Sequence, residues 1–571
     1  MPKTLAPVSA LRRDLFSFVR AQTGSFVSRY APGFKIPAYL AGYPVSTADA
    51  MPLLKLVSWL GKRGEKTVAG VPVETATQRL LRQIDGPSME VFNSFTLSEL
   101  LLAAGPFEGN PLLAGFTDAE RRNVAEGCDS SHIRMQNGKP LGGRPNNYWG
   151  VLARCEWGRL QLGLIRDRTL FDECLGKVKE FLALNPEGFW DDHQERAGRY
   201  DIYSADVLVF LEPLWPELRK DAAAGRNLDR MLRRMIALGE ALPLEGGISW
   251  AWGRSINGHS QSMLMELMSI GLREGWVADR PRALALVAEG SKALQKLFRD
   301  GYTSIQRDLG IERYRLGWRI FESTTDLLGK FAFTDDALSR LDPAEARLAK
   351  KPKSLWPAQD TWIPFDPDGA GVWVFRSKDM AFQLPVVAAN DPASYLPFPH
   401  APRTFENPCD NFIVCGAPHL LLDGRQYTSL GRPDSVKKEK NGLALVYDHW
   451  VAADEIPYGG HYIPFLPKKT GERRELPGRR EVRLRVSGRT LVIEEFWRFD
   501  VLPAAVALDV AEAKFPLALK VDCASPYTQN MIPVEGLTDW RTVWGTVKRV
   551  HQVSFEPRGE MRLTWTVKLG R

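Results

Sequence analysis

Hydrophobic residues recur at helical spacing along the chain from Leu11 to about Leu341. This i, i+3, i+4, i+7, i+8 spacing marks one buried helix face, and one clear example is the set Leu228, Met231, Leu232, Met235 and Ile236. The same pattern predicts further helices at about 11–29, 47–62, 74–84, 94–104, 149–165, 168–184, 203–214, 260–273, 282–299 and 311–330. Loops rich in Gly and Pro separate these segments, so we expect successive pairs of helices without strands between them.

Beyond residue 370 the pattern changes to the two-residue alternation of β-strands. The final segment, 561–569, alternates apolar and polar residues, as a strand with one buried face does. Two further alternating runs, 481–486 and 491–493, flank Ser487-Gly488, which predicts a hairpin. Many strands joined by turns, without helices, are typical of an antiparallel sandwich.

These two patterns predict an α+β protein of two domains. We expect a helical domain over 1–350, a linker rich in Pro and Lys over 351–370, and an antiparallel β-sandwich over 371–571. Paired helices followed by a β-sandwich form an architecture known from carbohydrate-active enzymes that are built on an (α/α) toroid.

Composition narrows the choice of partner only slightly. The net charge of +7 is compatible with an anionic ligand, but no block of like charges resembles a nucleic-acid-binding arm. The 17 Trp can fill a core or line a sugar-binding cleft. The six Cys show no metal-binding spacing with His, and no signal peptide or membrane-spanning stretch is visible. We therefore expect a cytoplasmic protein with no cofactor or metal, whose oligomeric state the sequence leaves open.

One segment, 145–211, carries the residues of greatest chemical interest. It begins with Asn146-Asn147-Tyr148-Trp149 at a predicted helix start. About fifty residues later, Arg196 is followed seven positions on by Tyr203, with Tyr200 three positions before that tyrosine. This segment resembles the toroidal polysaccharide lyases of the alginate lyase type, which carry Asn-Asn-His at a helix start and the same Arg and Tyr spacing. The sequence departs from that family at Tyr148, which stands where the family has His.

The resemblance implies β-elimination on a uronate-containing oligosaccharide or polysaccharide. Asn147 and Arg196 would neutralise the uronate carboxylate and stabilise the enediolate that forms when the C5 proton leaves. Tyr203 would act as the acid and base. Tyr148, at the position of the missing His, would carry a second proton or hydrogen-bond the substrate.

Other loops at helix starts offer further candidates. His193 precedes Arg196, and His259 follows a Gly-rich aromatic loop, so either imidazole is a candidate base. The candidate substrate contacts are Asn146, Trp149, Tyr200, Trp252, Arg254, Tyr314 and Arg315.

Three alternatives remain open at this point. A glycoside hydrolase on the same scaffold needs two carboxylates across a cleft, for which the candidates are Asp191, Asp192, Asp201, Glu322 and Asp326. A sugar-binding protein without catalysis uses the same aromatic residues. Finally, Asn at a helix start is also a common N-cap, and Arg and Tyr at these positions are also ordinary surface and core residues.

Overall fold

The computed structural model describes most of the chain. The described residues are 8–40, 43–87, 91–136, 139–140, 147–184, 188–190, 200–245, 249–252, 258–299, 301–303, 317–341, 352–367, 369–387, 398–401, 404–406, 416–429, 433–452, 475–512, 516–533, 541–542, 545–546 and 549–569.

The first part of the chain is helical, as predicted. Its helices are α1 (Val8–Tyr30), α2 (Ala50–Lys62), α3 (Val73–Leu81), α4 (Val91–Leu102), α5 (Asp118–Gly127), α6 (Asn147–Leu162), α7 (Thr169–Leu184), α8 (Ile202–Phe210), α9 (Trp215–Arg219), α10 (Ala222–Ala241), α11 (Gly258–Glu274), α12 (Arg280–Gln295) and α13 (Gly317–Ser339). The expectation that no strands interrupt them needs a small correction. Two-residue strands pair within three loops, as β1–β2 (Tyr39–Leu40, Tyr43–Pro44), β3–β4 (Thr67–Val68, Val71–Pro72) and β5–β6 (Met135–Gln136, Lys139–Pro140).

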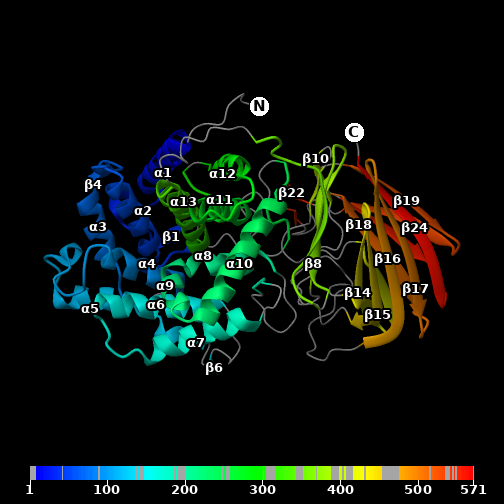
Figure 1. Ribbon diagram of the computed structural model, residues 1–571, viewed down its shortest axis with the longest axis horizontal. Helices are drawn as coiled ribbons and strands as arrows, with labels where there is room; N and C mark the ends of the chain where they lie inside the picture. Colours follow the sequence, from blue (N-terminus) through cyan, green and yellow to red (C-terminus); the bar gives the residue numbers. More distant parts are fainter. Residues whose placement is uncertain are drawn as a thin grey trace.

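Within the described part of the chain, six helices form a closed inner ring. The ring runs through α2, α4, α6, α8, α11 and α13, each helix contacts the next, and α13 contacts α2 again. The helices between them in sequence lie outside: α1 contacts α12 and α13, α3 contacts α2, α7 contacts α6, and α10 contacts α11. The helical part in Figure 1 is therefore an (α/α) toroid, which confirms the predicted fold class.

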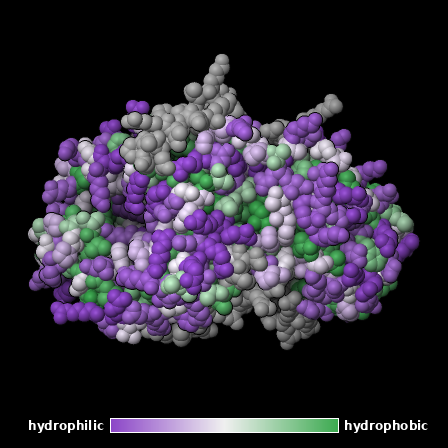
Figure 2. Space-filling view, viewed as in Figure 1, coloured by the Kyte–Doolittle hydropathy of each residue, from purple (hydrophilic) through white to green (hydrophobic). Residues whose placement is uncertain are grey.

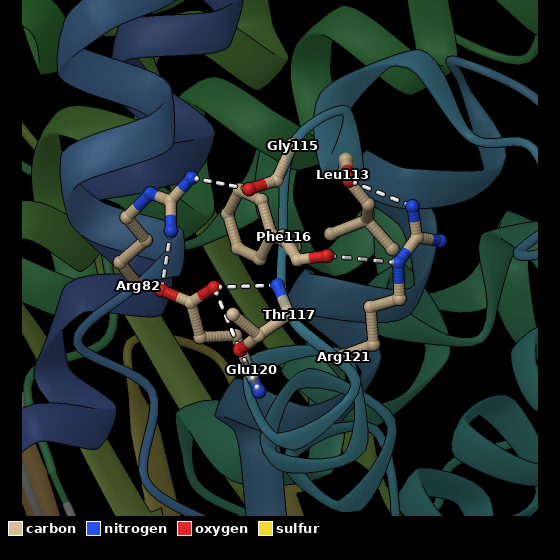
Figure 3. A network of polar contacts seen from close by, with 7 residues as sticks. All are labelled: Arg82, Leu113, Gly115, Phe116, Thr117, Glu120 and Arg121. Atoms are coloured by element: carbon tan, nitrogen blue, oxygen red, sulfur yellow. Dashed lines mark hydrogen bonds and ion pairs between the residues drawn. The ribbon is translucent and has the colours of Figure 1, made fainter.

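Polar contacts at the helix ends hold the outer layer together. Thr117 and Glu120 form a capping box at the start of α5. Arg82, just after α3, forms an ion pair with Glu120 and donates to the Gly115 carbonyl at 3.1 Å, so it ties the end of α3 to the start of α5 (Figure 3).

The second part of the chain forms two larger sheets. A five-stranded sheet has the order β10–β11–β9–β8–β7, and a larger sheet has the order β19–β24–β17–β16–β15–β13–β12–β18–β23–β20, with β14 paired to β15. The strands of the five-stranded sheet are β7 (Gln359–Pro364), β8 (Gly371–Arg376), β9 (Ala381–Val386), β10 (Phe398–Ala401) and β11 (Thr404–Glu406). Those of the larger sheet are β12 (Pro418–Leu422), β13 (Arg425–Thr428), β14 (Ser435–Glu439), β15 (Gly442–Ala452), β16 (Glu475–Ser487), β17 (Thr490–Phe499), β18 (Ala505–Glu512), β19 (Leu517–Cys523), β20 (Tyr527–Pro533), β23 (Arg549–Phe555) and β24 (Glu560–Leu569). A separate pair is β21 (Arg541–Thr542) with β22 (Gly545–Thr546).

Two details of this region bear on the sequence predictions. The predicted hairpin is present, because Ser487 of β16 pairs with Thr490 of β17 and Gly488 takes a φ of 58° in the turn. Strand β7 lies inside 351–370, so part of the expected linker is the edge strand of a sheet. Among the described strands, the pairing is antiparallel apart from a parallel contact of β11 with β9.

The five-stranded sheet is the middle layer between the helices and the larger sheet (Figure 1). Val372 and Val374 of β8 pack in the same apolar cluster as the helices. Trp373 and Phe375, on the opposite face of β8, pack in the cluster of the larger sheet. Because both faces of β8 are buried, its sequence is continuously apolar rather than alternating.

Side chains of this middle layer bind the backbone of the helical part. Gln383 of β9 donates to the Leu242 carbonyl at 2.8 Å and accepts from the Ala251 amide at 3.0 Å. Arg376 at the end of β8 donates to the Ala241 carbonyl at 2.7 Å. The segment that leads into α11 is thus held against the sheet.

The surface shows no separate apolar band on the face seen in Figure 2, where hydrophilic residues predominate and apolar ones gather in scattered patches. Among the described helices, none has the length and apolar character needed to cross a membrane.

Candidate active site

Each of the six inner helices contributes charged side chains to the interior of the ring. We call these residues the central cluster, and they are Lys55 (α2), Glu99 (α4), Arg154 (α6), Asp206 (α8), Glu266 (α11), and Asp326 and Lys330 (α13). Lys55 is coupled electrostatically to Arg154, which lies two helices away in the ring. Side chains from helices that are not neighbours can couple in this way because they point into a common interior.

Ion pairs connect the helices on both sides of this interior. On one side, Arg154 donates to Glu99 at 2.7 Å and to the Phe210 carbonyl at 2.6 Å, so it joins α4, α6 and the end of α8. On the other side, the Lys330 ammonium lies 2.9 Å from the Asp206 carboxylate and 3.2 Å from that of Glu266, so it joins α8, α11 and α13.

Burial has the largest effect on the pKa values of Glu266 and Lys330, which belong to the group that joins α8, α11 and α13. The pKa of Glu266 is raised to about 8, mainly by burial; Lys330 lowers it, and the nearby Asp206 and Asp326 add to the rise. Burial also works against the charge of Lys330, but Asp206, Glu266 and Asp326 together hold its pKa well above the usual value. Lys330 therefore stays charged.

A histidine and an aspartate form a pair beside this group. His259, on the first turn of α11, places Nε2 3.3 Å from Oδ2 of Asp326. Burial opposes the ionisation of Asp326, but Lys330 and His259 outweigh it and lower its pKa to about 2. The Asp326 side chain is 43% exposed and that of His259 is 17% exposed, so this pair lies where solvent has access.

The contacts between α11 and α13 show that these two helices run in the same direction. His259 meets Asp326, and Glu266, seven residues further along α11, meets Lys330, four residues further along α13. The candidate base His259 therefore lies toward the N-terminal end of α11, with Glu266 behind it on the same helix face.

On α6 and α8 too, a residue at the start of the helix shares a helix face with a residue of the central cluster. Asn147 begins α6 and lies seven residues before Arg154, so both are on one helix face. Tyr203 and Asp206 are three residues apart, and they are the two half-buried residues of α8, whose other residues are buried. Asn147, Tyr203 and His259 thus each lie at the start of an inner helix, on the face that carries a residue of the central cluster.

The backbone before Tyr203 is held by several contacts. Asp201 caps α8 by accepting from the Tyr203 amide at 3.1 Å. Tyr200 has a φ of 48°, a left-handed conformation that is unusual for a bulky residue. Its carbonyl accepts from the Trp250 indole at 3.0 Å, and its hydroxyl donates to Asp366 at 3.1 Å. The turn that presents Tyr203 is therefore fixed by contacts from two other segments.

Three aromatic residues that we expected to contact substrate are instead buried. Trp149 is 3% exposed, Tyr200 4% and Trp252 0%. The ring of Phe365, from the middle sheet layer, lies 4.8 Å from that of Tyr200 and 6.1 Å from that of Trp252. A sugar platform needs an open ring face. All three rings pack against protein instead. Tyr200 and Trp252 contact Phe365 and so join the middle sheet to the toroid.

Tyr148 is half-buried and packs against the apolar cluster of the helical part. The remaining candidates for the lyase lie outside the described residues, and these are Asn146, His193, Arg196, Arg254, Tyr314 and Arg315. Asp191 and Asp192, which the sequence offers for a hydrolase, also lie outside them. In the described part of the chain, no group of three or more His, Cys, Asp or Glu side chains is arranged to hold a metal ion.

Sequence reasoning did not select most of the central cluster. Lys55 and Asp206 are single charged residues within strongly apolar helical segments, and Lys330 stands between the apolar pairs Leu327-Leu328 and Phe331-Ala332. Such a residue faces either solvent or a polar interior, and the helical period alone does not distinguish the two. Their recurrence on successive inner helices is the signal that identifies them.

Comparison with solved structures finds polysaccharide lyases. The chain is similar to the chondroitin AC lyase of Streptomyces coelicolor A3, at 11% identity over 99% of this chain and 83% of that one, with a TM-score of 0.47. It is also similar to a heparinase III, at 11% identity over 97% and 84% of the two chains, with a TM-score of 0.26. A chondroitinase AC lyase gives 9% identity over 98% and 83%, with a TM-score of 0.28.

Toroidal polysaccharide lyases are thus among the structures similar to this chain, as the sequence resemblance suggested. Identities and TM-scores this low assign no reaction or residue role. No known protein family and no curated protein matches the sequence.

Proposed function

We propose that this protein is a lyase that cleaves a uronate-containing glycan by β-elimination. The observation that carries the proposal is the recurrence of Asn147, Tyr203 and His259 at the starts of three inner helices, each on the face that carries the central cluster. An amide, a phenol and an imidazole are the groups that carboxylate binding and proton transfer require.

In the proposed reaction, the Asn147 amide and the Arg196 guanidinium bind the uronate carboxylate. The C5 proton is removed, its electron pair forms the C4–C5 double bond, and the C4–O bond breaks. Tyr203 delivers a proton to the leaving oxygen. His259 is the candidate base, because Asp326 holds its imidazole and remains ionised with a pKa of about 2.

A hydrolase is a weaker alternative for Asp201 and Asp326, two of the carboxylates that the sequence offers for it. Asp201 is fully buried and caps α8, while Asp326 is paired with His259. The low pKa of Asp326 makes it a poor general acid. Neither of these residues has the environment of a catalytic acid.

The test is to incubate the protein with glucuronate-, mannuronate- and galacturonate-containing oligosaccharides and record the ultraviolet absorbance of the unsaturated uronate. We expect absorbance to rise, and Tyr203→Phe to reduce the rate about 10²- to 10⁴-fold because proton transfer is lost. New reducing ends without absorbance would identify a hydrolase and contradict the proposal. Binding with neither product would indicate a sugar-binding protein.

A further inference from the structure

The central cluster contains one cation without an ion-pair partner among the described residues. Arg154 is engaged by Glu99, and Lys330 is engaged by Asp206 and Glu266. Asp326, the remaining carboxylate of the cluster, is paired with His259. Lys55 makes no such pair in the described part of the chain, although the other charged residues of the cluster all do.

The surroundings of Lys55 are those of a binding position rather than of the outer surface. Its side chain is exposed to solvent, whereas its neighbours Leu53, Leu54, Leu56 and Val57 are buried. Burial is nevertheless the largest effect on Lys55 and lowers its pKa, with Arg154 and Lys330 acting in the same direction and Glu99 and Asp326 opposing them. An ammonium that is both accessible and destabilised by its surroundings gains most from an added anion.

The position of Lys55 in the ring determines which part of a substrate would reach it. Helix α2 lies three places from α8 in the ring of six, and therefore opposite the helix that carries Tyr203. Lys55 and Tyr203 therefore lie on opposite sides of the ring, so an anion at Lys55 would belong to a different sugar from the one that Tyr203 contacts.

Resting on the function proposed above, we propose that Lys55 binds an anionic group, carboxylate or sulfate, on a sugar next to the one that is cleaved. The ammonium supplies three donors and a point charge, which suits either anion. Lys55 then determines specificity, because it favours glycans that are acidic on adjacent units over those that alternate acidic and neutral sugars.

Binding measured by calorimetry tests this role without requiring turnover. The full chain carrying Tyr203→Phe would be titrated with three uronate-containing tetrasaccharides, whose neighbouring sugar is neutral, carboxylated or sulfated. Adding Lys55→Gln should weaken binding of the acidic forms by about tenfold to a hundredfold and leave the neutral form unchanged. The acidic ligand that loses more affinity on this substitution carries the anion that Lys55 prefers. Lys55→Arg should retain most of the affinity, and Lys62→Gln, in the last turn of the same helix, is the matched control.

The outcomes separate this inference from the proposed function. An equal loss for acidic and neutral ligands, or no loss at all, would overturn the role of Lys55 even if elimination is observed. Selective loss of acidic ligands without any elimination by the wild-type protein would retain Lys55 as an anion-binding residue and overturn the lyase. Thermal denaturation of each variant checks that the toroid is intact.

Discussion

Two groups of charged residues in this molecule differ in how many of their polar atoms have a hydrogen-bond or ion-pair partner within the protein. In the larger sheet, Arg480 and Glu495 are both fully buried and lie 2.8 Å apart. Arg480 also donates to the Ser429 and Gly416 carbonyls, and Glu495 accepts from the indoles of Trp497 and Trp565. Every strong donor and acceptor in this group is used within the protein.

The central cluster of the toroid is different. Asp326 is 43% exposed, and Lys55 is exposed and has no ion pair among the described residues. Buried polar groups are normally paired. A closed network such as that of Arg480 holds a core together, whereas an open one beside solvent is suited to a ligand.

The largest effect on stability should come from removing Arg480, which breaks its buried ion pair with Glu495. Arg480→Met leaves Glu495 charged and buried, and should reduce the free energy of unfolding by about 3–5 kcal/mol. Arg483→Met is the matched control, because Arg483 on the same strand pairs with Glu439 at the surface and should contribute less than about 1 kcal/mol. Urea denaturation measures both. Equal losses would contradict the distinction between the two networks.

Removing the partner of His259 should affect catalysis more than stability. Asp326→Asn keeps the shape but loses the charge that holds the imidazole, so kcat should fall about tenfold to a hundredfold. Asp229→Asn, which alters a surface pair with Arg219 on an outer helix, should leave kcat unchanged. If both variants retain full activity, the pair of His259 and Asp326 has no part in the reaction.

A gradual effect should appear in the pH dependence of stability. The raised pKa of Glu266, about 8, lies above the value of about 4.3 expected for an unfolded chain. Between these values the native protein holds a proton that the unfolded chain has lost, so the contribution of Glu266 to stability falls as pH rises through this window. The slope should be on the order of 1 kcal/mol per pH unit.

Glu266→Gln should flatten this dependence in thermal denaturation followed from acidic to mildly alkaline pH. The amide mimics the protonated acid and leaves the contact between Lys330 and Asp206 in place. A variant whose stability changes with pH as steeply as that of the wild type would show that Glu266 ionises normally.

The fold could be predicted from sequence where one helix face or one strand face is apolar. The apolar stripe of α10 and the hairpin of β16 and β17 are of this kind. Helix α5 was not predicted because Val124 and Gly127 are its only buried residues, although its capping box of Thr117 and Glu120 is visible in the sequence. Strand β7 falls in the predicted linker because Pro364 ends it and Pro357 and Pro367 flank it, and an edge strand tolerates proline.

The candidate site was predictable only in part. Asn147 and Tyr203 could be selected by spacing and helix position, and the structure places them at the starts of inner helices. The burial of Trp252 was not predictable, because Phe365, which packs on it, lies more than a hundred residues away in sequence. Lys55 depends likewise on how the ring closes, since the residues that surround it come from α4, α6 and α13.

The most direct test of the account compares two tyrosines that are three residues apart. Tyr203 is half-buried on the face of α8 that carries Asp206, whereas Tyr200 is buried and bonded to Asp366. Initial rates of unsaturated product would be measured for Tyr203→Phe and Tyr200→Phe. We predict that Tyr203→Phe loses elimination while Tyr200→Phe keeps kcat and loses about 1 kcal/mol of stability. A Tyr203→Phe protein that is as active as the wild type would contradict the proposed site.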